Sequence, residues 1–192
     1  ILDASPEFDY IVVGAGSSGC VLANRLSAEA RHTVLLLEAG GPDRSPWIHI
    51  PIGYGKTIFD KRINWGYETE PEPELEGRRI YWPRGKVLGG SGSVNGLVYI
   101  RGQREDFDGW AAQGNPGWSY AGLLPYFRKS ERQARGLDAF HGADGPMWVS
   151  DLSEHHPLCE AFIGSARRLG MPLNPDFNGE RQEGVGYFQL TT

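Results

Sequence analysis

Residues 8–19 read FDYIVVGAGSSG, and their pattern is the strongest indication of the fold in this sequence. The β-branched run at 8–13 ends abruptly in glycine, as a buried parallel strand does. Apolar side chains then recur at a helical spacing as far as Leu26. A second apolar run at 33–37 predicts another strand, which ends at Glu38. This order of strand, glycine turn, helix and strand predicts an α/β fold with a Rossmann-like parallel sheet.

The glycines of this turn have separate roles in a nucleotide site. Gly14 permits the tight turn, Gly16 lets a pyrophosphate approach the backbone, and Gly19 lets the helix pack closely on the strand. The start of the helix offers N–H groups and a positive dipole end to phosphates. Glu38 lies about 20 residues further on, where a carboxylate accepts the ribose hydroxyls of a dinucleotide. The stretch therefore predicts a dinucleotide site, with NADP the least favoured nucleotide.

Composition excludes several other classes of protein. The chain has 192 residues, a net charge of −5 and 27 glycines gathered in clusters, and no Lys/Arg-rich stretch with stacking aromatics that would bind nucleic acid. Its two cysteines are far apart and form no metal-binding or disulfide pattern, so no metal site is expected and a reducing compartment is the default. No apolar run is long enough to span a bilayer. We expect a cytoplasmic protein, with or without peripheral attachment to a membrane.

A second glycine cluster, WPRGKVLGGSGSVNG, occupies residues 82–96. Consecutive small residues let neighbouring N–H groups point into one concavity that binds an anion, and Arg84 and Lys86 add positive charge. A flexible surface loop is the alternative. The apolar residues on both sides of the cluster favour a buried, shaped loop with a binding role.

Six segments in a fixed order resemble the glucose–methanol–choline (GMC) oxidoreductase family. They are residues 14–19 with Glu38, NWGYET at 64–69, RGKVLGGSGSVN at 84–95, GNPGWSY at 114–120, LPYFRKSE at 124–131 and HGADGP at 141–146. The resemblance extends over residues 8–192 and is greatest with the bacterial choline dehydrogenase and aliphatic alcohol dehydrogenase branch. It implies an FAD-binding domain with lid and loop insertions at residues 8–146, and the beginning of an α+β substrate-binding domain at 147–192.

The resemblance also implies FAD as the cofactor and a set of residues that bind it. These are Gly14, Gly16, Ser17, Ser18, Gly19, Glu38, Trp65, Arg84, Gly90, Ser91, Asn95, Gly96 and Val98. Asn95, Gly96 and Val98 match the segment that runs beside the isoalloxazine ring. Some members of the family bind the flavin covalently through a histidine at the position of Val94, which valine cannot do. The resemblance therefore implies non-covalent FAD.

The implied activity is oxidation of a primary alcohol to an aldehyde, with electrons passed to a quinone-type acceptor or to oxygen. A flavin-dependent lyase, a fatty-acid photodecarboxylase and a nucleotide-binding fragment without activity of its own are the alternatives. In the family the catalytic base is a histidine near the C-terminal end, and nothing in these residues matches it. We therefore name no catalytic residue and expect the base in a C-terminal remainder, present as a second chain or as a further part of the protein.

Further elements are expected along the chain. Helices are predicted at 105–113, at 119–133 with Ser119 as N-cap, and at 156–169 with Leu158, Phe162 and Leu169 facing inward; strands are predicted at 145–150 and 184–190. His141 is predicted to serve loop hydrogen bonds. The pair His155–His156 with Cys159 is predicted to begin a helix rather than to bind a metal. Residues 1–7 are left outside the fold prediction.

Overall fold

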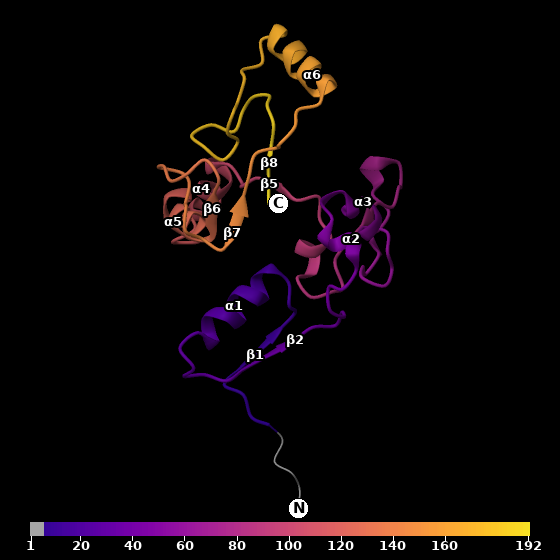
Figure 1. The fold of residues 1–192 in the computed structure, drawn as a ribbon, viewed down its shortest axis with the longest axis vertical. Coiled ribbons are helices and arrows are strands. Elements are labelled where there is room, and N and C mark those ends of the chain that lie inside the picture. The colour runs from indigo at the N-terminus through magenta and orange to yellow at the C-terminus, as the bar shows by residue number, and fades with distance from the viewer. Residues whose placement is uncertain (1–5) are drawn as a thin grey trace, which may run out of the picture. The chain divides into compact units, whose positions relative to one another are not determined.

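The computed structural model describes residues 6–192, so the first five residues of the segment that the sequence left unassigned lie outside the described part (Figure 1). The chain forms two compact units, Ile1–Gly96 and Leu97–Thr192. These contact units are not the two expected domains, and the domain boundary between residues 146 and 147 stays a prediction.

The first unit begins with the predicted strand–turn–helix–strand motif. Strand β1 (Tyr10–Val13) pairs in parallel with β2 (Val34–Leu37), and helix α1 (Ser17–Ser27) connects them. In Figure 1 the helix lies along the two strands. The register joins Tyr10 to Val34 and Val13 to Leu37, so the carboxyl ends of both strands meet at one edge. That edge carries the glycine turn and Glu38.

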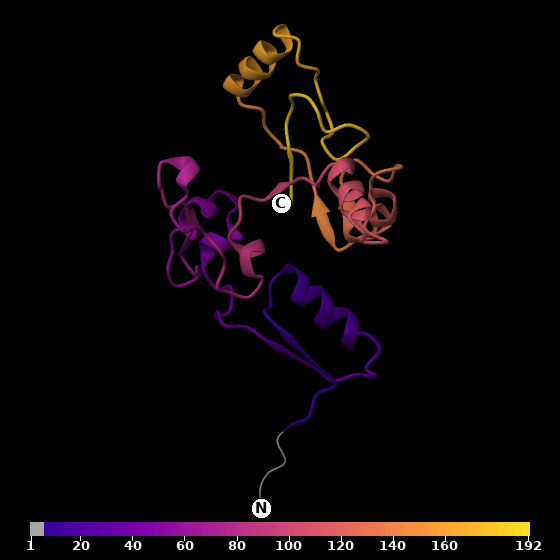
Figure 2. The ribbon, with the colours of Figure 1, turned by 180° about the vertical axis from the view of Figure 1, so that it is seen from behind.

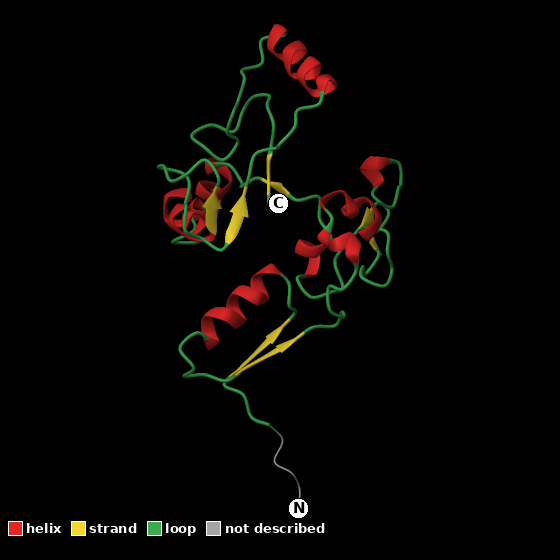
Figure 3. Ribbon diagram, in the orientation of Figure 1, coloured by secondary structure: helices red, strands yellow, loops and turns green. Residues whose placement is uncertain are grey.

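The remainder of the first unit is mostly loop with short elements, as Figure 3 shows. They are α2 (Pro46–His49), a 3₁₀ turn η1 (Pro51–Gly53), α3 (Tyr54–Thr57), β3 (Tyr67–Glu68), η2 (Pro73–Leu75), β4 (Tyr81–Trp82) and η3 (Gly90–Ser93). Strands β3 and β4 form an antiparallel pair. The second glycine cluster therefore forms a loop that includes η3.

Two helices pack together in the second unit. Helix α4 (Arg104–Ala112) and helix α5 (Tyr120–Ser130) meet through Phe107, whose ring contacts those of Tyr120 and Phe127. The hydroxyl of Ser119 accepts a hydrogen bond from the N–H of Gly122 at 3.3 Å, which confirms the predicted N-cap. A helix needs such an acceptor because its first N–H groups have no partner within the helix.

The prediction of a helix at 119–133 was wrong for residues 131–133, which form a strand. The backbone becomes extended at Glu131, and β6 (Glu131–Gln133) pairs in parallel with β7 (Met147–Val149). Glu131 and Gln133 are buried on one side of this strand. The side chains of Glu131 and Gln133 form hydrogen bonds with residues that are distant in sequence but belong to the same unit. A helix that continued through these positions would lose those hydrogen bonds.

The remaining strands are shorter than predicted. Strand β5 (Val98–Tyr99) pairs with β8 (Gln189–Leu190), so only two residues of the predicted strand at 184–190 lie in a ladder. The predicted strand at 145–150 is limited to β7. Short strands of this kind are held by side-chain contacts and turns more than by the ladder itself.

The third long helix, α6 (Pro157–Arg168), exists as predicted, but its inward face was assigned wrongly. Leu158, Phe162 and Leu169 are 73%, 70% and 90% exposed, whereas Ile163 is buried. In both ribbon views α6 stands apart from α4 and α5 (Figures 1 and 2). Periodicity identified the helix, but the packing partner decides which of its sides is covered.

Across residues 6–192 no helix is long and apolar enough to cross a bilayer.

Candidate functional site

The first glycine turn is shaped to receive an anionic ligand. Gly14 adopts a φ of +95°, which an L side chain rarely tolerates, and Gly16 is the N-cap of α1. No side chain caps this helix and its first turn contains no acidic residue. A Cβ on Gly16 would meet no protein atom within 4 Å, so the space above it is open. The helix terminus thus presents its dipole and N–H groups to open space, as phosphate sites do.

Gly19 has a different role, which is close packing. A Cβ on Gly19 would overlap the carbonyl oxygen of Gly14. Ser17 and Ser18, the two residues before it, are exposed in the first turn of α1. The turn therefore keeps its tight path only with glycine at position 19, while the serine side chains remain accessible.

Glu38 connects the turn to the loop that follows β2. One carboxylate oxygen accepts the N–H of Ala15 at 2.8 Å, and the other accepts the N–H of Gly40 at 2.8 Å. Bonds of an N–H to a carboxylate are stronger than those between neutral groups. Glu38 therefore holds both backbone segments at the carboxyl edge of the sheet, and its expected contact with a ribose stays a prediction.

The second glycine cluster packs against the carboxyl edge of the β1–β2 sheet. The N–H of Gly89 donates to the carbonyl of Ala15 at 2.8 Å, and the N–H of Leu88 donates to that of Gly41 at 2.9 Å. A Cβ on Gly90 would lie 2.9 Å from the Cα of Gly16. Glycine is therefore required where the two clusters approach most closely. The sequence predicted both clusters as parts of one site, and the fold brings them together.

Serine side chains shape the second cluster from within. The hydroxyl of Ser91 accepts the N–H of Gly85 at 3.1 Å, and that of Ser93 donates to the carbonyl of Leu88 at 2.8 Å. The predicted contact of Ser91 with the cofactor stays a prediction. In this structure the Ser91 hydroxyl fixes the loop that contains Gly90.

The aromatic and basic residues of this region contact one another. The ammonium of Lys86 lies 4.6 Å from the ring centre of Trp65, and Trp65 stacks on Tyr67. The guanidinium of Arg84 donates to the carbonyl of Pro83 and lies over the ring of Trp82. Trp65 is 43% exposed, which leaves one part of its surface open to a ligand.

Asn64 organises this region, and sequence reasoning did not single it out. It is buried; its side-chain oxygen accepts the N–H groups of Gly66 and Arg84, and its amide donates to the carbonyl of Ile58. The sequence signal that could have identified Asn64 is its place directly before Trp65 and Tyr67, where a polar side chain stands among aromatic residues. Asn64 fixes the path of the chain on both sides of Trp65.

The stretch predicted to run beside the flavin follows η3. Asn95, Gly96 and Val98 are exposed, whereas Val94 is buried and carries no atom able to bond covalently to a flavin. The backbone of Leu97 adopts a φ of +64°. The chain therefore makes a sharp turn inside this stretch.

The GMC oxidoreductase family model matches residues 8–192. The chain belongs to the GMC oxidoreductase family. The chain is 48% identical to mitochondrial choline dehydrogenase of Mus musculus over 96% of its own length and 32% of the relative. It is 46% identical to an alcohol dehydrogenase [acceptor] of Pseudomonas putida over 96% of its length and 34% of the relative. The chain thus spans about a third of these curated relatives.

Solved structures of GMC-type fold agree with this assignment. Pyridoxine 4-oxidase from Mesorbium loti superposes with a TM-score of 0.90 at 34% identity, over 97% of this chain and 37% of that one. An Aspergillus oryzae formate oxidase superposes with a TM-score of 0.83 at 28% identity, over 96% and 34%. The fold is therefore the Rossmann-like α/β fold of the GMC FAD-binding domain, as predicted.

FAD is the cofactor of this GMC domain, and the residues at the carboxyl edge fit it. The open N-terminus of α1 suits the diphosphate, and the glycines at the contact of the two clusters leave room for a ligand close to the backbone. With valine at position 94, FAD is held without a covalent bond there. The individual contacts of the predicted residues with FAD remain predictions.

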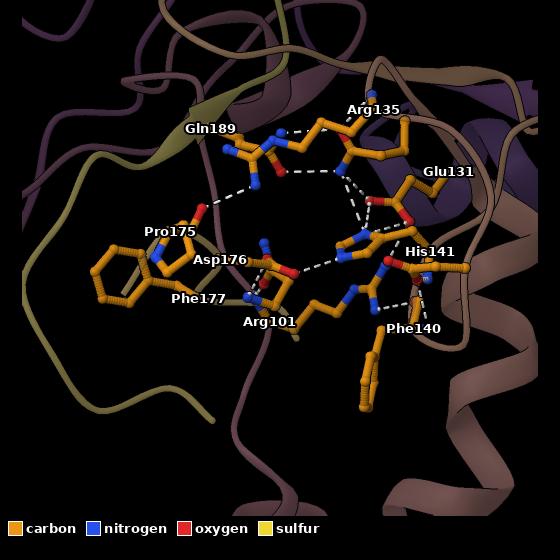
Figure 4. A network of polar contacts seen from close by, with 12 residues as sticks. Arg101, Glu131, Arg135, Phe140, His141, Pro175, Asp176, Phe177 and Gln189 are labelled. Atoms are coloured by element: carbon orange, nitrogen blue, oxygen red, sulfur yellow. Dashed lines mark hydrogen bonds and ion pairs between the residues drawn. The ribbon is translucent and has the colours of Figure 1, made fainter. Parts of the chain in front are cut away.

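A second cluster of charged residues lies in the second unit, and Figure 4 shows it. The fully buried carboxylate of Glu131 pairs with the guanidinium of Arg101 at 2.7 Å and with the imidazole of His141 at 3.0 Å. The other ring nitrogen of His141 lies 2.9 Å from the carboxylate of Asp176. These bonds join Arg101, two residues beyond the end of β5, to strand β6 and to two loops. Sequence reasoning assigned hydrogen bonds to His141, which is confirmed, but missed both carboxylates.

The two carboxylates raise the pKa of His141 to about 9. Its hydrogen bond to Asp176 is the largest cause and that to Glu131 the next, while burial acts in the opposite direction. The same contact with His141 helps to lower the pKa of Asp176 against the effect of burial. With this pKa His141 is a cation at neutral pH, paired with both carboxylates.

The remaining histidines of interest begin α6. Nδ1 of His156 accepts the N–H of Leu158 at 3.2 Å as the N-cap of the helix, and the His155 ring stacks on Tyr187 at 4.0 Å. Among residues 6–192 no group of three or more His, Cys, Asp or Glu side chains is arranged to hold a metal ion. The predicted role of this pair at a helix start is confirmed for His156.

Proposed function

We propose that the protein containing this chain is an FAD-dependent oxidoreductase that oxidises a primary alcohol to an aldehyde. The observation that carries the proposal is the meeting of the two glycine clusters beside Glu38 and the open start of α1. The family match over residues 8–192 supports it, as do relatives whose names are choline dehydrogenase and alcohol dehydrogenase [acceptor].

Each part of the site has a role in this proposal. The N–H groups at the start of α1 bind the diphosphate, and Glu38 accepts the ribose hydroxyls. Asn95, Gly96 and Val98 border the flavin ring, where fixed donors favour its reduced, anionic form. FAD supplies the chemistry by accepting a hydride at N5 from the alcohol carbon. The chain's own residues hold and orient the cofactor.

The group that removes the hydroxyl proton is proposed to lie outside these 192 residues. The chain spans about a third of its curated relatives, so a C-terminal remainder has room for a base and for most of the alcohol pocket. The alcohol itself, whether aliphatic, aromatic or choline-like, is chosen by that pocket. The proposed electron acceptor is oxygen or a quinone; several relatives are named oxygen-dependent choline dehydrogenase. The cytoplasmic location, with or without peripheral membrane attachment, stays a prediction, since the relatives include bacterial proteins and proteins named as mitochondrial.

The test is the visible absorption spectrum of the full protein, recorded without oxygen before and after addition of choline, of aliphatic primary alcohols and of aromatic primary alcohols. A yellow protein whose absorption bleaches with an alcohol supports the proposal. A yellow protein that no alcohol bleaches contradicts it and favours the lyase, or the photodecarboxylase if turnover of a fatty acid requires light. A colourless protein would contradict the cofactor role itself.

A further inference from the structure

Leu97 has a backbone conformation that leucine rarely adopts. Its φ is +64°, and Ala30 and Glu76 are the other non-glycine residues with positive φ between residues 6 and 192. In this region the Cβ of an L-residue crowds the carbonyl oxygen. The side chain of leucine has no polar atom that could form a compensating local bond. The conformation must therefore be imposed by the surrounding structure.

Thr191 supplies that constraint. Its N–H donates to the carbonyl of Leu97 at 3.0 Å, and its hydroxyl donates to the same oxygen at 3.3 Å. The neighbouring residue, Leu190, pairs with Val98 across the β5–β8 ladder. Leu190 also exchanges two backbone hydrogen bonds with Ser150, at 2.9 and 3.0 Å. Strand β8, which precedes Thr191, is therefore hydrogen-bonded to β5 on one side and to Ser150 on the other.

The turn at Leu97 lies within the segment that is proposed to border the flavin. Leu97 lies between Gly96 and Val98, which the proposed function places along the flavin ring. Strained backbone residues occur preferentially where a site needs a fixed geometry. A change of φ at Leu97 would rotate the peptide groups on both sides of it.

We propose that Leu97 and Thr191 are positioning residues that fix the path of residues 95–98 along the flavin. Thr191 acts through the Leu97 carbonyl and need not touch the cofactor. The inference rests on the proposed function, because it assumes that this segment borders FAD.

The experiment compares variants of the full, FAD-loaded protein. Leu97→Val places a β-branched residue, the kind that tolerates positive φ least, at φ +64°, and Ala30→Val does the same at φ +51°, in the connection between α1 and β2. Three quantities are measured: the midpoint potential of FAD, the rate of flavin reduction by an alcohol, and the thermal midpoint. We expect Leu97→Val to shift the potential and slow reduction at least several-fold, because the turn must change its φ, and Ala30→Val to change neither.

Thr191 variants separate positioning from stability. Thr191→Val removes the hydroxyl donor and keeps the shape, whereas Thr191→Ser keeps the donor. We expect Thr191→Val to shift the flavin potential in the same direction as Leu97→Val, and Thr191→Ser to match the wild type. The inference is overturned if Leu97→Val leaves the flavin properties as unchanged as Ala30→Val does, or if Thr191→Val lowers the thermal midpoint alone. A wild type without FAD would overturn the proposed function as well, so the two failures are distinguishable.

Discussion

The N–H of Gly89 donates a 2.8 Å hydrogen bond to the carbonyl of Ala15, and this bond joins two glycine clusters that are far apart in the sequence. Ala15 is also the residue whose N–H binds the carboxylate of Glu38. One short turn thus bonds through its backbone to the acidic residue after β2 and to the second cluster. The consequence is a single rigid edge where a dinucleotide can lie against the backbone.

Glu38→Ala removes the acceptors of the Ala15 and Gly40 N–H groups, and Glu38→Gln removes one of them. Each lost bond to a charged acceptor costs about 1.5–3 kcal/mol, which corresponds to roughly 10- to 150-fold weaker binding. We expect FAD content after dialysis to fall in the order wild type, Glu38→Gln, Glu38→Ala. Glu29→Ala, at an exposed residue paired with Arg31, is the control. Full flavin content in Glu38→Ala would contradict the role of this carboxylate.

Gly19→Ala places a methyl group on the carbonyl oxygen of Gly14. The turn must open, and we expect loss of FAD binding together with lower stability. Gly109→Ala is the matched control, because Gly109 lies inside α4 and its Cβ would meet nothing within 4 Å. That change should raise stability by about 0.5–1 kcal/mol. Equal FAD content in the two variants, measured by absorbance, would show that close packing at Gly19 is unimportant.

Glu131→Gln leaves the guanidinium of Arg101 buried without its counter-charge. Breaking a buried pair by removing one partner costs about 3–5 kcal/mol. Urea unfolding should show a loss of this size, and Arg101→Met combined with Glu131→Met should lose less than the sum of the single changes. Asp60→Asn breaks an exposed pair with Arg62 and should change little. A small effect of Glu131→Gln would mean that water reaches the pair.

The raised pKa of His141 leads us to expect that the stability of the fold depends on pH. Its pKa rises from 6.5 to about 9 in the folded protein, so the imidazolium stabilises the fold fully below pH 6.5, and this contribution disappears as the pH rises through about 9. We expect His141→Gln to be destabilised most at pH 6 and to approach the wild type above pH 9, as measured by urea unfolding across the range. Parallel stability curves for the two proteins would exclude a charged His141.

The local parts of the nucleotide site could be predicted because their cause is local. Gly14 needs a positive φ, the strand ends where glycine begins, and Glu38 follows the next apolar run. These constraints act over a few residues and are visible as composition and spacing. The start of α5 was predictable for the same reason, since Ser119 caps the helix that follows it.

Other features depend on residues that are distant in sequence. Nothing near Glu131 shows that the helix must end there; the strand forms because Met147 supplies a partner and because Arg101 and His141 neutralise the buried carboxylate. The exposed side of α6 was assigned wrongly because an amphipathic pattern does not reveal what covers it.

Glycines, a carboxylate and apolar spacing were enough to predict the strand–turn–helix–strand motif and a dinucleotide site, since these signals act locally. The family and FAD were predicted from the resemblance of six sequence segments. The contact of Gly89 with Ala15 and the hold of Thr191 on the strained Leu97 became visible only in the folded chain. Both contacts depend on the path of the whole chain, because a hydrogen bond between distant residues forms only after packing has brought their backbones together.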